Sequence, residues 1–319
     1  MTGKYLINNL KKKDREKGIT LICTFSRQVL VKIFFKALDN MDLPRKDMHL
    51  LVYDNTEDIG LTESLKEEIN NRLTDYLSVR LYKSYLKGKG SIAGSGNEQF
   101  KKSKLFNIWS MWKQLYVNHG GMIYTPEFFQ LEDDTIAPPD AYKRLTKTFY
   151  KKPNSAMVIG IETGRGAVPW NPVRLGVHMC KVENNTFLWR HSLSPFTRGI
   201  KKVDCCGVYC FIVDTKIFHD AFDEYDPGKM KIPFFGMDNY LTWKITNAGY
   251  DILADFNVWC SHLQCSAGRI IAFSKDQAVE MYDKWLPECN NYCQGVEVKK
   301  LNQRSRRYQV RKQAFTIEL

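Results

Sequence analysis

The chain has 319 residues, of which 44% are apolar and 26% are charged, and this ordinary globular composition excludes a disordered or collagen-like protein. Lys and Arg number 47 against 35 Asp and Glu, which gives a formal net charge of +12. The excess favours an anionic partner, such as a nucleotide, a nucleic acid or an acidic membrane surface, and does not select among them. The length fits one large domain, or a catalytic domain with a small appendage.

Targeting and membrane signals are not apparent in the pattern. The lysine-rich start, residues 1–17, runs into no apolar stretch of the kind that a secretory signal needs. No apolar run reaches the ~18 residues of a membrane span. The nine cysteines do not form paired C-x2-C units, so we expect reduced, mostly buried thiols and not a structural zinc site. We therefore expect a cytoplasmic protein without an integral membrane segment.

Strands and helices alternate between residues 19 and 135. Ser26 follows the first strand and is a plausible N-cap for the first helix. Such alternation predicts parallel β-α units, whose ligands bind at the carboxyl ends of the strands. The predicted strands are 19–25, 48–53, 78–82 and 128–131, and the predicted helices are 28–40, 61–76 and 97–118.

The second half is less regular and mixes hairpins with single helices. We expect it to extend the same sheet and to build a second side of a binding site. The fold class predicted for the whole chain is α/β, with a Rossmann-like, mostly parallel sheet flanked by helices and a mixed C-terminal half. The predicted strands here are 155–161, 177–183, 186–190, 207–213, 251–254 and one near Val258, and the helices are 215–222 and 237–247, the last ended by Gly249.

The most informative short motif is the acidic run Glu132-Asp133-Asp134, directly after a predicted buried strand. Three acids at such a place repel one another, and a hard divalent cation with oxygen ligands would relieve the repulsion and neutralise a diphosphate at the same time. A helix N-terminus is the alternative, because acids favour the helix dipole and 138–140 opens a predicted helix close by. The motif alone does not decide between the two.

The context of that motif resembles the GT-A fold glycosyltransferases, most closely those like family 2, over about residues 19–265. The resemblance implies a GT-A domain at 19–270, in which 19–135 receives the nucleotide sugar and 136–270 the acceptor. A basic N-terminal extension, 1–18, and a C-terminal helix with a basic tail, 271–319, flank it. The segments that carry the resemblance are Thr24-Phe25-Ser26-Arg27, Val52-Tyr53-Asp54, Gln130 to Thr135, Gly236 to Leu241 and Trp259-Cys260-Ser261-His262.

The resemblance also implies the chemistry: a sugar, most simply from a UDP-sugar, leaves a nucleoside diphosphate with the help of Mn²⁺ or Mg²⁺. Asp134 and His262 would hold the cation with Asp133 nearby, and the histidine favours manganese over magnesium. A satisfied core histidine is the alternative for His262. Asp238 would be the general base of an in-line displacement with inversion, with a plain helix cap as its alternative and retention still open.

On the donor side, the resemblance places Thr24 and Arg27 in the turn after the first strand and Asp54 against the base or ribose. The Gly-rich stretch that ends at Asn97 would lie beside the donor, with Asn97 at the matching place. A turn residue for Asp54 and a surface loop for 88–97 are the alternatives. Two departures from the family pattern, Met237 for Glu and Tyr240 for a second Asp, favour a different acceptor pocket.

Two basic tracts, 80–104 and 299–312, account for much of the positive charge. Charge runs are usually solvated faces, but the second tract lacks an apolar stripe for a membrane and combines cations with Tyr308, as nucleic-acid binding requires. We expect an anionic acceptor, bound through Arg304, Arg306, Arg307 and Arg311.

The preferred acceptor is a hydroxylated base in DNA, as some phages modify, in which case the protein would act in the host cytoplasm. The alternatives are a polysaccharide or lipid-carrier glycosyltransferase, or a non-catalytic nucleic-acid-binding protein on a GT-A-like scaffold. One set of residues distinguishes the enzyme from the binding protein, because a protein that only binds nucleic acid does not need these side chains to converge. The set is Asp133, Asp134, Asp238 and His262.

Overall fold

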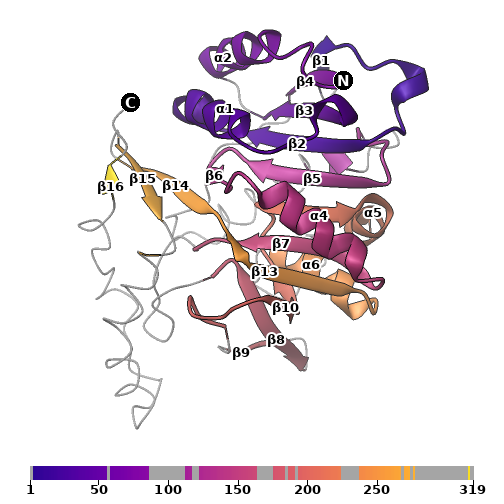
Figure 1. The fold of residues 1–319 in the computed structure, drawn as a ribbon, viewed down its shortest axis with the longest axis vertical. Coiled ribbons are helices and arrows are strands. Elements are labelled where there is room, and N and C mark those ends of the chain that lie inside the picture. Colours follow the sequence, from indigo (N-terminus) through magenta and orange to yellow (C-terminus); the bar gives the residue numbers. More distant parts are fainter. Residues whose placement is uncertain are drawn as a thin grey trace.

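The computed structural model describes residues 3–55, 58–85, 112–116, 122–163, 175–183, 186–190, 193–223, 237–266, 269–273, 276 and 315–316. Within these ranges a nine-stranded sheet runs through the molecule, with β1 at one edge and β10 at the other (Figure 1). In spatial order its strands are β1 (Gly3–Asn8), β4 (Ser78–Ser84), β3 (Met48–Asp54), β2 (Ile19–Phe25), β5 (Glu127–Glu132), β12 (Cys210–Asp214), β7 (Ser155–Ile161), β13 (Asp251–Trp259) and β10 (Ile200–Val203).

Six of these nine described strands point the same way. β4, β3, β2 and β5 are parallel neighbours, and β7 is parallel to β13. Since β12 is antiparallel to both β5 and β7, those two strands also share a direction. β1, β12 and β10 run the opposite way. The predicted α/β class with a mostly parallel sheet is confirmed.

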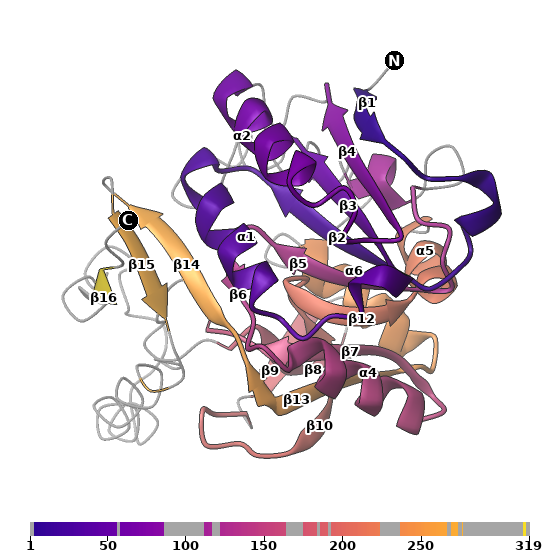
Figure 2. The ribbon, with the colours of Figure 1, turned by 45° about the horizontal axis from the view of Figure 1, so that its top comes forward.

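Helices cover both faces of the sheet, which explains why its central strands are buried and mostly apolar. Every residue of β2 and of β3 is buried, as parallel strands covered on both faces require. In Figures 1 and 2, one group of helices lies on one face of the sheet and a second group on the other. The first group is α1 (Val31–Asp39), α2 (Ile59–Asn70) and α4 (Ala141–Lys151), and the second is α5 (Thr215–Asp223) and α6 (Met237–Asn247). No helix of the described part of the chain is long and apolar enough to cross a membrane.

Two smaller sheets adjoin the main one. In the second of them, β6 pairs with β14 so that His262 lies opposite Thr135. This pairing brings the late histidine next to the acidic motif, although about 130 residues of sequence separate them. The strand orders are β11 (Cys205–Cys206), β8 (Val177–Glu183), β9 (Thr186–Arg190), and β16 (Phe315–Thr316), β15 (Arg269–Phe273), β14 (Ser261–Ser266), β6 (Thr135–Ile136).

Several local predictions were wrong in detail. Ser26 does not cap the first helix, which starts as a 3-10 turn without a side-chain cap and continues as α1. The second helix, α2, ends at Asn70 and not at residue 76, because its apolar face stops at Ile69 and two asparagines, poor helix formers, follow. The predicted strands at 251–254 and Val258 are one strand, β13.

The N-terminal extension contributes a strand that the sequence did not predict. β1 pairs antiparallel with β4, so that residues 3–8 form an edge of the main sheet. The helix predicted at 97–118 is described only at 112–116, where it is helical. Gly249, with φ of +95°, ends α6 as expected.

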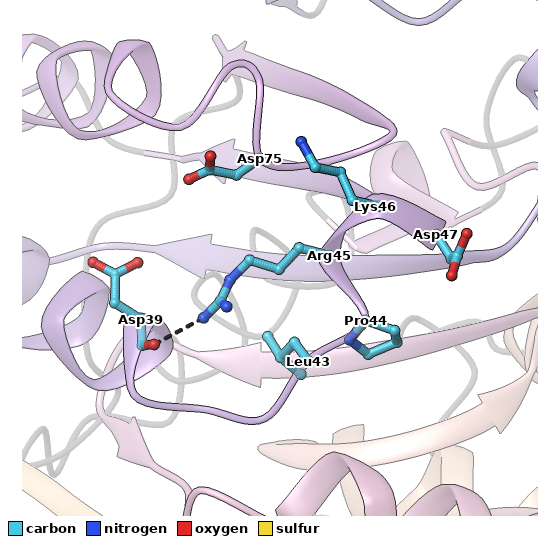
Figure 3. Close-up of a pocket in the computed structure, with 7 residues that line it drawn as sticks. All are labelled: Asp39, Leu43, Pro44, Arg45, Lys46, Asp47 and Asp75. Atoms are coloured by element: carbon cyan, nitrogen blue, oxygen red, sulfur yellow. Dashed lines mark hydrogen bonds between the residues drawn. The ribbon is translucent and has the colours of Figure 1, made fainter.

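A hollow of about 560 Å³ opens where the chain enters β3 and β4, at the amino ends of these strands (Figure 3). Its arginine is already engaged, because Arg45 Nη2 donates to the carbonyl oxygens of Leu38 and Met41 at 2.9 and 3.2 Å and thereby closes the end of α1. Ligands of parallel sheets bind at the opposite, carboxyl ends. We therefore assign this hollow a structural role; it is lined by Asp39, Leu43, Pro44, Arg45, Lys46, Asp47 and Asp75.

Candidate active site

The acids singled out in the sequence gather at one edge of the main sheet. Phe25 at the end of β2 pairs with Asp54 at the end of β3, and Thr24 pairs with Glu132 at the end of β5. Only β2 separates Asp54 from Glu132, which corresponds to about 10 Å for two strand spacings. β12 starts at the same edge, since its first residue, Cys210, pairs with Leu131. The carboxyl edge is therefore a shared surface of both halves of the chain.

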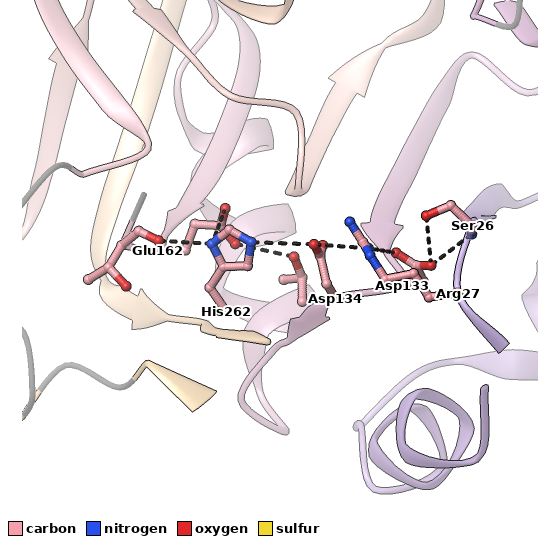
Figure 4. Close-up of polar contacts among 8 residues, drawn as sticks. Ser26, Arg27, Asp133, Asp134, Glu162 and His262 are labelled. Atoms are coloured by element: carbon pink, nitrogen blue, oxygen red, sulfur yellow. Dashed lines mark hydrogen bonds and ion pairs between the residues drawn. The ribbon is translucent and has the colours of Figure 1, made fainter. Parts of the chain in front are cut away.

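Arg27 joins the two aspartates of the acidic motif (Figure 4). Its Nη1 lies 2.5 Å from Asp133 Oδ1 and 3.0 Å from Asp134 Oδ2. Asp133 also accepts hydrogen bonds from the backbone N–H and the hydroxyl of Ser26, at 2.7 and 3.2 Å, and its own N–H donates to the carbonyl of Thr24. Both aspartates are buried, so one guanidinium offsets much of their mutual repulsion.

The structure places His262 against the other side of Asp134. Its Nε2 lies 3.4 Å from Asp134 Oδ2, and its Nδ1 lies 2.9 Å from the carbonyl oxygen of Thr163. When the ring is neutral and donates its Nδ1 hydrogen to this carbonyl, Nε2 carries a lone pair that faces Asp134. This is the orientation that a metal-binding histidine adopts.

Glu162 is a site residue that the sequence prediction missed. Its Oε1 lies 3.5 Å from His262 Nδ1, and its Oε2 accepts a hydrogen bond from the hydroxyl of Thr135 at 3.2 Å. Burial raises the pKa of Glu162 to about 8, the charge of Glu132 acts in the same direction, and His262 opposes the shift. The signal was available, since Glu162 directly follows the last residue of β7, as Asp133 follows that of β5.

The donor set fits a divalent cation that shares its coordination with a ligand. Asp134 supplies carboxylate oxygen and His262 an imidazole nitrogen, which together suit Mn²⁺. Among the described residues, no three His, Cys, Asp or Glu side chains converge closely enough to enclose a metal ion by themselves. The remaining positions would fall to water or to diphosphate oxygens, as is usual for cations bound with nucleotides. Arg27 would then have to release Asp134.

Asp54 is engaged inside the protein. It is fully buried, and its Oδ2 accepts hydrogen bonds from Lys83 Nζ at 2.9 Å and from the Thr62 hydroxyl at 2.6 Å. Lys83 also donates to Thr62, so the three side chains form a closed cluster between β3, β4 and α2. A direct contact from Asp54 to a base or ribose requires this cluster to open. Thr24 lies in the middle of the sheet edge and is 9% exposed.

Asp238 lies beside the segment 207–209, which leads into β12. It is the second residue of α6 and half-buried, and its Oδ2 lies 3.6 Å from the position that a Cβ on Gly207 would occupy. Two residues after Gly207, the carbonyl oxygen of Tyr209 accepts a hydrogen bond from the backbone N–H of Glu132 at 3.0 Å. Asp238 is thus connected to the end of β5 through a short, buried segment. It lies in the first turn of α6.

Some predicted residues lie outside the described part of the chain. They are Asn97 of the Gly-rich stretch and Arg304, Arg306, Arg307 and Arg311 of the second basic tract.

No family model matches the chain, and no curated protein matches it. Among solved structures, it is similar to GalNAc-T7, crystallised with UDP, GalNAc and Mn²⁺, at 14% identity and a TM-score of 0.51, over 79% of this chain and 45% of that one. The mannosyltransferase PcManGT from Pyrobaculum calidifontis, in complex with GDP-Man and Mn²⁺, gives 12% identity and a TM-score of 0.43, over 77% and 56%. TarS of S. aureus, residues 1–349, gives 13% and 0.40, over 76% and 60%.

The matched region of this chain thus spans 45% of the GalNAc-T7 chain and no more than 60% of the other two. An identity of 14% is too low to transfer an activity, so the likeness to GalNAc-T7 bears on the architecture alone. The chain has the GT-A fold.

Proposed function

We propose that the protein is a metal-dependent glycosyltransferase, which moves a sugar from a nucleoside diphosphate, most simply UDP, to a hydroxyl acceptor. The observation that carries the proposal is the contact of Asp134 with His262, beside Asp133 and Arg27, at the carboxyl edge of a GT-A fold. Two buried carboxylates and an imidazole are costly to desolvate. A cationic ligand at this edge would explain why the fold tolerates them.

Each residue of this group has a distinct task in the proposed reaction. Asp134 and His262 hold the cation, and Thr163 and Glu162 orient the His262 ring toward it. Arg27 turns from the aspartates to the diphosphate, whose oxygens a guanidinium can bind in a bidentate manner. When bound, Mn²⁺ or Mg²⁺ supplies a Lewis acid for the charge that develops on the leaving diphosphate.

Asp238 is the proposed general base. It is the second residue of α6, a helix that lies behind the sheet in Figure 2. A carboxylate there can accept the proton of an acceptor hydroxyl as it attacks the sugar carbon from the side opposite the leaving group. A single displacement of this kind inverts the configuration at that carbon.

The proposed acceptor is a hydroxylated base in DNA. The net charge of +12 and the basic tract at 299–312 support an anionic acceptor. If the protein is encoded by a phage, it would act in the cytoplasm of the host. A lipid carrier that ends in a phosphate is also anionic, and the assay below separates it from DNA.

A panel of nucleotide sugars, incubated with the protein and Mn²⁺, tests the proposal directly through release of nucleoside diphosphate. Release with one sugar, above a control without protein, is the expected result. The nucleotide sugar that is turned over is then incubated with hydroxymethylated DNA, with unmodified DNA and with a polyprenyl phosphate. The mass of each acceptor is measured by mass spectrometry. Absence of release with every sugar would contradict the enzyme, and transfer to the polyprenyl phosphate alone would contradict the DNA acceptor.

A further inference from the structure

A basic hollow of about 510 Å³ lies between helix α4 and the neighbouring strands β10 and β13. In Figure 1, α4 crosses the face of the sheet in front of β7, above β13. The helix packs its apolar residues, such as Leu145 and Phe149, against the sheet and turns its lysines outward. The hollow is lined by Asp42, Asp140, Lys143, Arg144, Lys147, Thr148, Lys151, Lys152, Ile200 and Asp255.

The five cationic side chains of this hollow outnumber its three aspartates. Asp140 is paired with Arg144 at 2.5 Å, and Asp255 accepts two hydrogen bonds from Asn257. Within the described residues, none of Lys143, Lys147, Lys151 and Lys152 forms an ion pair. Like charges at i and i+4 on one helix face repel each other, so an anion in the hollow would relieve a cost that the free protein bears.

The spacing of the lysines suits a chain of anionic groups. Lys143, Lys147 and Lys151 follow one another at intervals of four residues, and at 1.5 Å per residue the row is about 12 Å long. One phosphate does not span such a row, whereas successive phosphates of a polymer do.

An exposed aromatic ring accompanies the row. Tyr150 is 62% exposed, and at 100° per residue it lies only about 20° around α4 from Lys143. Its ring packs edge-on against Phe149, with centroids 5.3 Å apart. Cations in a row beside a fixed, exposed aromatic ring are what single-stranded nucleic acid binds, through its phosphates and through stacking of a base.

We propose that the α4 hollow binds the phosphate backbone of a single nucleic-acid strand, with Tyr150 stacked on one of its bases. The inference rests on the proposed function, because it names the class of acceptor. It adds a surface distinct from the tract at 299–312. Only six residues, 135–140, separate Asp134 from the start of α4. The lysine row therefore begins at the end of α4 that is nearer to Asp134 and runs from there toward the start of β7.

The test is the binding of fluorescein-labelled dT20 by anisotropy between 50 and 200 mM salt. Lys147→Glu/Lys151→Glu should weaken binding at least tenfold and lower the salt slope by about 1.4, since each phosphate contact on a single strand contributes about 0.7. Lys12→Glu/Lys13→Glu, at an exposed 3-10 turn elsewhere, changes the net charge equally and should bind nearly as the wild type. Lys147→Gln/Lys151→Gln removes the same two positive charges without introducing acids, and so controls for misfolding caused by the glutamates.

Tyr150→Ala should weaken dT20 binding about tenfold, because loss of base stacking leaves only the phosphate contacts. Equal losses in the two charge-reversal pairs would overturn the proposal, because they would reflect net charge alone. Equally tight binding of inorganic polyphosphate, unchanged by Tyr150→Ala, would also overturn it. Release of nucleoside diphosphate without acceptor should be the same in all these variants. If dT20 binding behaves as expected while no nucleotide sugar is turned over, the proposed function fails and the nucleic-acid surface stands.

Discussion

Replacing Arg27 with methionine tests whether the two aspartates are held together by positive charge. Methionine keeps the length of the side chain and removes the guanidinium that lies 2.5 Å from Asp133 and 3.0 Å from Asp134. The aspartate side chains are only 4% and 2% exposed. Removing one partner of a buried ion pair costs about 3–5 kcal/mol, and the hydrogen bonds from Ser26 to Asp133 place this case near the lower end.

A loss of about 3 kcal/mol corresponds to a drop of roughly 6–12 °C in melting temperature, at about 2–4 °C per kcal/mol for a large domain. The assay is thermal unfolding in EDTA and in millimolar MnCl2. Saturating Mn²⁺ should reduce the difference in melting temperature between the variant and the wild type. A cation that binds only the folded state stabilises that state, and in the variant it does not have to compete with Arg27 for the aspartates.

Arg144→Met is the matched control. Arg144 also pairs with an aspartate, Asp140, but both side chains are nearly half exposed, and exposed pairs contribute at most about 1 kcal/mol. The control should melt within about 4 °C of the wild type with either additive. The reasoning is refuted if Arg27→Met melts like the wild type in EDTA. It is refuted equally if its deficit is the same with and without Mn²⁺.

Three further substitutions test other parts of the account. Asp238→Asn should lower transfer by about two to four decades with little change in donor affinity, and near wild-type turnover would remove Asp238 from the mechanism. Glu162→Ala should weaken Mn²⁺ binding, measured by calorimetry, about 10- to 100-fold because the His262 ring loses a neighbour, while Glu162→Gln should lose less; equal affinities would contradict this role. Burial, and then the charge of Arg80, lowers the pKa of His49, so the folded state keeps this ring neutral. The unfolded chain takes up the proton below about pH 6.5, and stability should fall as the pH drops through that range. The free energy of unfolding of His49→Gln, measured with urea, should lack this pH dependence. An identical pH dependence in the wild type and in the variant would exclude this role for His49.

The positions of the acids could be predicted from the sequence because they follow from strand ends. Apolar runs mark β2, β3 and β5, and in a parallel sheet the residues after such runs meet at one edge. That rule placed Asp54 and Asp134 correctly, and it covers Glu162 as well. Glu162 was overlooked because a single acid after a strand is far less conspicuous than the run of three at 132–134.

Partnerships across the fold could not be predicted in the same way. Pairing of β6 with β14 fixes His262 beside Asp134, and nothing local in either segment specifies that register. The engagement of Asp54 by Lys83 depends on the alignment of β3 with β4, which the connection through α2 does not reveal. The edge strand β1 is short, and its polar and apolar residues do not alternate regularly, so the hydrophobic pattern did not predict a strand there.

The most direct test of the central claim is the release of nucleoside diphosphate by the wild type and by Asp134→Asn, with Mn²⁺ and with excess EDTA. We predict release by the wild type with Mn²⁺, its loss in EDTA, and its recovery when Mn²⁺ is restored. Asp134→Asn should be inactive in both conditions while its circular dichroism matches the wild type, because the carboxylate serves the cation and not the core. Full activity of the wild type in excess chelator, or of Asp134→Asn with Mn²⁺, would contradict the account.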